Sequence, residues 1–203
     1  MSTADSTSST SATHYAGFSD PVREASRVFR VLLEAMAHPG RICKVDRDLQ
    51  PIGNVHPTTL AALLTLADAD TPVCLVGHAG AEFPSYLRFH CGCPITGNPN
   101  DAAFGLITDP ALVRKAFDFP IGTDEYPDTS ATVIVQVKSL VGGARQTIKG
   151  PGIKSTAKLA PTVDTGFWAA WRANTQLYPC GIDIIFTSES DVVALPRSSR
   201  LEG

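Results

Sequence analysis

The sequence predicts an α/β fold in which helices flank a mixed β-sheet of about seven strands. Short runs rich in β-branched residues alternate with segments whose apolar residues recur at helical spacing. The chain has 203 residues, of which 43% are hydrophobic and 18% are charged. This length and composition fit one globular domain, which we place at residues 17–203.

The first expected helix begins at Pro21, with the Asp20 carboxylate as its N-cap, and ends at His38-Pro39-Gly40. Helical spacing predicts one apolar face on it, made of Val22, Ala25, Phe29, Leu32, Leu33 and Met36. Further helices are expected over 57–67, 83–90, 110–117 and 165–177.

Strands are expected at 42–45, 73–76 and 104–108, and in two hairpins. In the first hairpin, 131–153, a β-branched strand turns at Gly142-Gly143 and returns with period-two alternation. In the second, 182–196, two apolar runs flank the turn Ser188-Glu189-Ser190.

Charge and hydropathy exclude several classes of protein. A net charge of -3 and a pI near 5.9 argue against a general nucleic-acid binder. No apolar run approaches the roughly 20 residues that a membrane-spanning helix needs. Residues 1–16 are rich in Ser and Thr and lack the features of a signal peptide, so we expect a disordered tail. Five cysteines, an odd number, indicate reduced thiols and a cytoplasmic location.

The stretch Arg88-Phe-His-Cys-Gly-Cys-Pro94 places a histidine and two cysteines close together, as in a metal site. A structural zinc site has four ligands, commonly in two pairs, and no second cysteine pair exists here. A redox pair is more typically Cys-x-x-Cys. We therefore predict a tight turn at Gly92, with no metal bound by Cys91 and Cys93.

Basic residues beside glycines mark a candidate anion site at 142–154. Backbone N–H groups together with Arg145 and Lys149 suit a phosphate, although the order of residues is not that of a P-loop. A hairpin with a glycine-rich exit explains the same residues without a ligand. The candidate phosphate-binding residues, chosen on charge and context, are Arg88, His90, Arg145, Lys149 and Arg197. No nucleophile–base pair or cofactor loop is recognisable, so the catalytic residues are unassigned.

Six segments, in order, resemble the H-subunit family of the bacterial carbon–phosphorus lyase system, PhnH. The resemblance covers about residues 17–200 and excludes both the Ser/Thr-rich tail and Cys91-Gly92-Cys93. The segments are FRVLLEAMAHPG (29–40), LLTLADADTPV (63–73), LRFH (87–90), GGARQTIKGPGI (142–153), YPCGIDIIF (178–186) and ALPRSS (194–199).

This resemblance implies a role in organophosphonate catabolism. The family's subunit works with the G, I and L subunits to make α-D-ribose 1-methylphosphonate 5-triphosphate from ATP and methylphosphonate. The G, H, I and J subunits form a core complex in which the H subunit is a homodimer. The resemblance also implies the fold of the pyridoxal-phosphate-dependent transferases without their cofactor site, and hence no cofactor.

On this basis we expect a non-autonomous subunit of a transferase/lyase complex that contacts ATP or a phosphonate and is inactive alone. Two other functions stay open. One is a stand-alone phosphate- or nucleotide-binding protein. The other is a pyridoxal-phosphate enzyme with Lys149 or Lys154 as the Schiff-base lysine.

Overall fold

The computed structural model describes residues 15–202. The expected tail at 1–16 therefore lies almost entirely outside the described residues. Tyr15 and Ala16 lie against the helix α3 (Phe83–Cys91), where the Tyr86 hydroxyl donates to the carbonyl of Ala16. None of the helices in 15–202 combines the length and hydropathy that crossing a bilayer requires.

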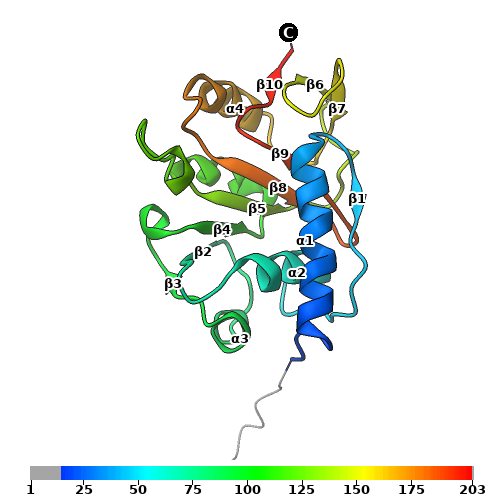
Figure 1. Cartoon of the computed structure of the whole chain (residues 1–203), viewed down its shortest axis with the longest axis vertical. Helices are drawn as coiled ribbons and strands as arrows, with labels where there is room; N and C mark the ends of the chain where they lie inside the picture. Colours follow the sequence, from blue (N-terminus) through cyan, green and yellow to red (C-terminus); the bar gives the residue numbers. More distant parts are fainter. Residues whose placement is uncertain (1–14, 203) are drawn as a thin grey trace, which may run out of the picture.

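A seven-stranded mixed sheet forms the centre of the molecule, which confirms the predicted class (Figure 1). Five neighbouring strands are parallel, β9 is antiparallel to β8, and β1 is antiparallel to β9. In spatial order the strands are β1 (Cys43–Lys44), β9 (Asp191–Leu195), β8 (Asp183–Thr187), β5 (Thr132–Gln136), β4 (Phe104–Ile107), β2 (Val73–Val76) and β3 (Ile95–Thr96).

Helices cover both faces of this sheet, so its strands read as nearly continuous apolar runs. One face packs against α1 (Pro21–Ala37), α2 (Pro57–Leu66) and α3, with Leu106, Ile134 and Ile185 turned toward them. The other face packs against the 3₁₀ helix η2 (Pro110–Asp118) and α4 (Gly166–Gln176). Within residues 15–202, two short 3₁₀ turns, η1 (Pro99–Asp101) and η3 (Pro127–Thr129), complete the helical elements.

Helix α1 begins as predicted, because the Asp20 carboxylate accepts a hydrogen bond from the Arg23 N–H at 3.1 Å. The residues of the predicted apolar face are not all in the core. Leu32 is buried, but Val22, Phe29 and Leu33 are exposed, and the buried residues of α1 are Val28, Leu32 and Ala35. The helix has apolar residues on more than one side, and only one side contacts the sheet layer.

A second sheet of three antiparallel strands lies beyond the end of the first. Its order is β10 (Arg200–Leu201), β6 (Gln146–Lys149) and β7 (Ala157–Leu159). The predicted hairpin at 131–153 is therefore wrong, because β5 and β6 belong to different sheets. Strand β5 has β4 and β8 on its two sides, which leaves β6 no edge to pair with. The hairpin at 182–196 is confirmed by the antiparallel pairing of β8 and β9.

Two glycines of the basic segment are required by close backbone contacts. A Cβ at Gly152, where φ is +79°, would overlap the carbonyl oxygen of Ala37 at the end of α1. A Cβ at Gly143 would overlap the carbonyl oxygen of Pro161. Both glycines thus allow the backbone of the 142–153 segment to approach the backbone at Ala37 and Pro161 closely, so their role is in packing.

Candidate functional site

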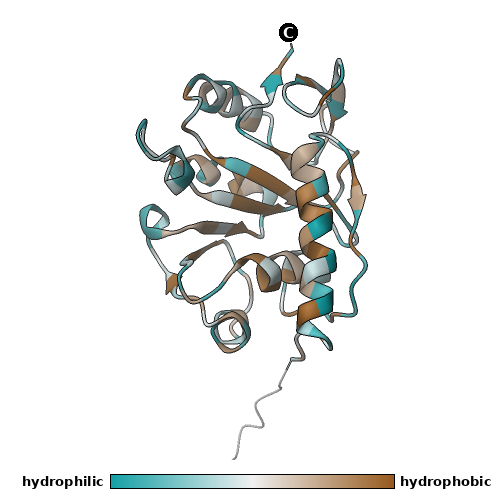
Figure 2. Ribbon diagram, viewed as in Figure 1, coloured by the Kyte–Doolittle hydropathy of each residue, from teal (hydrophilic) through white to brown (hydrophobic). Residues whose placement is uncertain are grey.

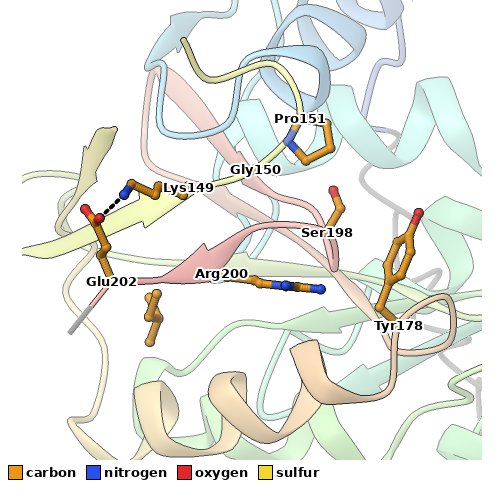
Figure 3. A pocket seen from close by; sticks show the side chains of 8 residues that line it. Lys149, Gly150, Pro151, Tyr178, Ser198, Arg200 and Glu202 are labelled. Carbon is orange, nitrogen blue, oxygen red and sulfur yellow. Dashed lines mark ion pairs between the residues drawn. The ribbon is translucent and has the colours of Figure 1, made fainter. Parts of the chain in front are cut away.

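A cavity of about 500 Å³ lies beside the three-stranded sheet, between β6, β10 and the loop after α4 (Figure 3). Strands β6 and β10 pair antiparallel, with Arg200 opposite Lys149, so both strands contribute cations to this place. The lining residues are Lys149, Gly150, Pro151, Tyr178, Ser198, Arg200, Leu201 and Glu202.

The two cations of the cavity differ in their partners. The Lys149 ammonium forms an ion pair with Glu202, and both side chains are exposed. Within residues 15–202, no hydrogen bond or ion pair engages the Arg200 guanidinium. Figure 3 shows Arg200 extending away from the Lys149–Glu202 pair, toward Ser198 and Tyr178. Arg200 is therefore the cation available to an anion in this cavity.

The turn before Arg200 is held in place by a partly buried ion pair. The Arg197 Nε and Nη2 atoms donate to Asp183 at 2.5–3.2 Å, and Nη1 donates to the carbonyl of Pro127 at 2.8 Å. The Arg197 N–H also donates to Asp183, at 2.7 Å. Trp171 Nε1 donates to the carbonyl of Ser199 at 3.0 Å. These bonds attach the turn to β8 and α4 and so fix the start of β10.

Arg197 thus uses its guanidinium on Asp183 and Pro127 and orders the chain next to the cavity. Its predicted phosphate contact would compete with these hydrogen bonds.

Arg88 and His90 lie on α3, at the opposite end of the molecule from β6 and β10 (Figure 1). The His90 Nε2 atom is 3.1 Å from the carbonyl oxygen of Tyr15, and its ring lies 4.4 Å from the ring of Tyr86. These contacts attach the N-terminal segment to α3. Arg88 is exposed in the last turn of the same helix.

Arg145 lies in a third place. It borders a smaller cavity of about 190 Å³, together with Lys158, Ile42 and Val141. The five residues chosen from the sequence are therefore not brought together. Of these five, only Lys149 lines the larger cavity, and Arg197 supports it from behind.

The Cys91-Gly92-Cys93 stretch forms the predicted turn. Gly92 ends α3 in the left-handed region at φ +70°, and its N–H donates to the carbonyl of Arg88 at 3.1 Å. Burial, with a smaller contribution from Cys93, raises the pKa of the Cys91 thiol to about 12. Burial also raises the pKa of Cys93. Residues 15–202 hold no group of three or more His, Cys, Asp or Glu side chains placed for a metal ion.

The carboxyl ends of β5 and β8, where open α/β sheets commonly bind ligands, are covered in this fold. The Gln136 side chain accepts from the His56 N–H at 2.8 Å and donates to the carbonyl of Asn54 at 2.7 Å. The Thr59 and Thr187 hydroxyls lie 2.7 Å apart. Gln136, Thr59 and Thr187 are buried, so this network joins the start of α2 to the sheet.

Sequence reasoning missed Arg200, Ser198 and Tyr178. The segment Pro196-Arg-Ser-Ser-Arg200 holds two arginines three residues apart, and the sequence does not tell which one pairs with a buried carboxylate. Tyr178 comes from a loop 22 positions before Arg200, so its proximity follows from the tertiary fold alone.

A family model described as bacterial phosphonate metabolism protein (PhnH) matches residues 16–202. The chain belongs to this family. The match takes in α1, the seven-stranded sheet and all residues that line the larger cavity. The PhnH resemblance expected from six short segments is thereby confirmed over the whole described fold.

Two further proteins are similar to the chain over most of its length. One, from Rhizobium meliloti (strain 1021), is named alpha-D-ribose 1-methylphosphonate 5-triphosphate synthase subunit PhnH. It is 37% identical over 191 residues, which cover 93% of this chain and 96% of the relative. The other is the putative C-P lyase subunit protein HtxG of Stutzerimonas stutzeri. It is 27% identical over 177 residues, which cover 85% of this chain and 83% of the relative.

Proposed function

We propose that this chain is the H subunit of a carbon–phosphorus lyase system for organophosphonate catabolism. In this role it acts with the G, I and L subunits to form α-D-ribose 1-methylphosphonate 5-triphosphate from ATP and methylphosphonate. The observation that carries the proposal is the 37% identity to the Rhizobium meliloti synthase subunit over 96% of that protein. The proposed subunit is cytoplasmic, forms a homodimer and associates with the G, I and J subunits.

The chemistry of the described residues supports a subunit rather than a complete enzyme. The larger cavity offers cations and hydroxyls but no nucleophile with an adjacent base. The thiol of Cys180, in the loop after α4, donates to Asp124 at 3.7 Å. Burial, and then the Asp124 carboxylate, raise the pKa of Cys180, so it stays protonated at neutral pH. The bond-breaking groups are therefore expected on a partner subunit.

We assign the larger cavity as the place where this subunit contacts the phosphate or phosphonate group of a ligand. Arg200 supplies a cation without a partner among residues 15–202, and a planar guanidinium suits two oxygens of one phosphate. Lys149 adds a second cation, because its exposed ion pair with Glu202 is weak and exchangeable. The hydroxyls of Ser198 and Tyr178 complete a set of donors.

The other expectations from the sequence stay predictions. Arg88, His90 and Arg145 are exposed and do not share a site, so we propose no common ligand for them. The likeness to the pyridoxal-phosphate-dependent transferase fold, without its cofactor site, also stays a prediction. Lys149 and Lys154 are both exposed, a poor setting for a Schiff base. Purified protein should accordingly lack a visible aldimine absorption band.

Deletion of the gene tests the subunit role. The deletion strain should not grow on methylphosphonate as sole phosphorus source and should grow normally on phosphate. Purified chain alone should not turn over ATP with methylphosphonate, and co-expressed G, I and J subunits should purify with it. Growth of the deletion strain on methylphosphonate, or turnover by the isolated chain, would contradict the proposal.

Calorimetry on the assembled complex tests the cavity separately. Arg200→Ala should weaken binding of ATP or methylphosphonate about ten-fold or more, since a charge-assisted hydrogen bond contributes about 1.5–3 kcal/mol. The ligand affinity of Arg200→Lys should lie between those of wild type and Arg200→Ala, because lysine keeps the charge and loses the planar geometry. Arg172→Ala, at an exposed arginine of α4 that does not line the cavity, is the matched control and should bind normally. Equal affinity of Arg200→Ala and wild type would reject the cavity and leave the subunit role intact.

A further inference from the structure

The outer face of α1 carries a row of large apolar side chains that nothing in residues 15–202 covers. Val22, Phe29 and Leu33 are 81%, 49% and 56% exposed. Their spacing of seven and four residues places them on one side of the helix, away from Val28 and Leu32 in the core. In Figure 2 the ribbon of α1, which lies in front of the sheet, has several brown segments along its length. A helix already anchored in the core does not need this second apolar row to fold.

Arginines border the same row. Arg23, Arg27 and Arg30 line a shallow depression with Val22 and Ser26. Arg23 lies 3.5 Å from Asp20, whereas no ion pair within the described residues engages Arg27 or Arg30. This face, defined by Val22, Arg27, Phe29, Arg30 and Leu33, is hereafter the α1 face.

The acidic side chains of α1 do not neutralise this face. Glu24 accepts a hydrogen bond from the Asp20 N–H at 2.8 Å, at the very start of the helix. Glu34 forms ion pairs with Arg41 and with His38, the latter at 3.2 Å if that ring is protonated. The carboxylates are thus bound within the chain, and the α1 face is apolar and positive. Its complement is an apolar surface that carries carboxylates.

A second copy of this chain does not provide that complement. In a two-fold symmetric contact the same patch meets itself, so one positive face whose carboxylates are already bound would oppose another. Such like-charge contacts disfavour association by the α1 face. An anionic membrane would attract the arginines. However, the helix cannot tilt or insert freely, because its opposite side is packed in the core through Val28, Leu32 and Ala35.

We propose that the α1 face is the docking surface for a different protein chain, one that presents apolar side chains flanked by Asp or Glu. This inference rests on the proposed function, and the partner is another subunit of the same complex. Phe29 and Leu33 are the apolar anchors, and Arg27 and Arg30 pair with the partner's carboxylates at the rim.

Charge reversal on the α1 face is the first test. Arg27→Glu/Arg30→Glu keeps good helix formers in an exposed position, so the chain should fold and melt as wild type does. Affinity for the co-expressed partner subunits should fall about ten-fold or more and become less dependent on salt. The matched control, Lys154→Glu/Arg172→Glu, reverses two exposed cations elsewhere and should bind normally. Phe29→Asp should also release the partner, whereas Val141→Asp, at another exposed apolar residue, should not.

Photo-cross-linking identifies the occupant. A benzoyl-phenylalanine at position 29, in the assembled complex, should link to an acidic segment of one partner subunit. Linkage to a second copy of this chain would overturn the proposal, as would flotation of the chain with phosphatidylserine vesicles that Arg27→Glu/Arg30→Glu abolishes. Wild-type affinity of both α1 variants would also overturn it. If wild-type chain failed to bind any subunit of the system, the proposed function would fail first, and the two failures are therefore distinguishable.

Discussion

The two sheets of this molecule have opposite environments. Strands β5 and β8 of the seven-stranded sheet are buried over nearly their whole length. In the three-stranded sheet, β6 and β7 each have one buried residue and β10 has none, and Lys149 and Arg200 are exposed. A sheet with helices on both faces offers a ligand mainly the ends of its strands, and in this fold the carboxyl ends of β5 and β8 are covered. The smaller sheet has an open side, and the cavity with its cations lies there.

One ion pair joins the two environments. Asp183 begins β8 in the large sheet, and Arg197 leads into β10 in the small one. Only 12% of the Asp183 side chain and 17% of the Arg197 side chain are exposed, so the pair is mostly desolvated. Mutations should therefore reduce stability most in the large sheet, less at this ion pair, and least around the cavity.

The largest expected effect is that of Phe186→Ala in β8. Phe186 is fully buried and its ring meets that of Phe167 edge-on, with centroids 5.6 Å apart. Removing it leaves a cavity and should lower the free energy of unfolding by about 3–5 kcal/mol. Urea denaturation followed by tryptophan fluorescence measures this. Gln146→Ala in β6 is the comparison and should change stability by about 0.5 kcal/mol or less. Equal losses of stability in Phe186→Ala and Gln146→Ala would contradict the expectation that the large sheet contributes more to stability than the small one.

Removing the Asp183–Arg197 ion pair should lower the free energy of unfolding somewhat less than Phe186→Ala does. Asp183→Asn keeps an acceptor for the Arg197 N–H but removes the charge opposite the guanidinium. Leaving that cation without its partner should lower the free energy of unfolding by about 3 kcal/mol. The same denaturation experiment on Asp128→Asn, an exposed aspartate of η3, should show no significant change. If Asp183→Asn left the free energy of unfolding unchanged, solvent would replace the ion pair without loss of stability, contrary to this prediction.

At the cavity, Arg200→Ala should leave stability within about 0.5 kcal/mol of wild type, because no other group in the described part of the chain bonds to the guanidinium. Thermal melts of both proteins test this directly. A large loss would assign Arg200 a role in the fold and weaken its assignment to ligand binding.

The smallest effect concerns pH and the covered end of the large sheet. Burial lowers the pKa of His56 below its ordinary value of 6.5, against a smaller opposing effect of Glu189. The unfolded chain therefore binds a proton at this histidine before the folded chain does. Stability from this group is present above pH 6.5 and is lost as the pH falls toward the folded pKa. Denaturant midpoints of His56→Gln should fall less on acidification from pH 7 to 5 than those of wild type.

The large sheet was predictable from the sequence, and the small one was not. Apolar runs such as Thr132–Gln136 and Asp183–Thr187 identify buried strands. The pairing of β8 with β9 was predictable because only the short turn Ser188-Glu189-Ser190 separates them in the sequence. Period-two alternation in 146–149 also identifies a strand, but carries no information about its partner. The partners of β6 are β7 and the distant β10, a pairing set by the tertiary fold.

The candidate site was predictable only in part, for the same reason. Charge and nearby glycines pointed to Lys149, but Arg197 and Arg200 differ in role because Asp183 lies beside one of them. The apolar residues of α1 show a related limit. Helical spacing identifies Val22, Phe29 and Leu33 as apolar positions on a helix, but not whether this chain or another protein covers them.

The outermost strands of the large sheet, β1 and β3, are each two residues long. Such short edge strands leave few backbone N–H and C=O groups unpaired, so a strand from another chain can form few hydrogen bonds with them. Open-ended growth by strand addition is thereby disfavoured, even where many copies of the chain accumulate before their partners are made. Association with other chains then depends on side-chain surfaces of limited area, and each such surface is fully occupied once one partner has bound.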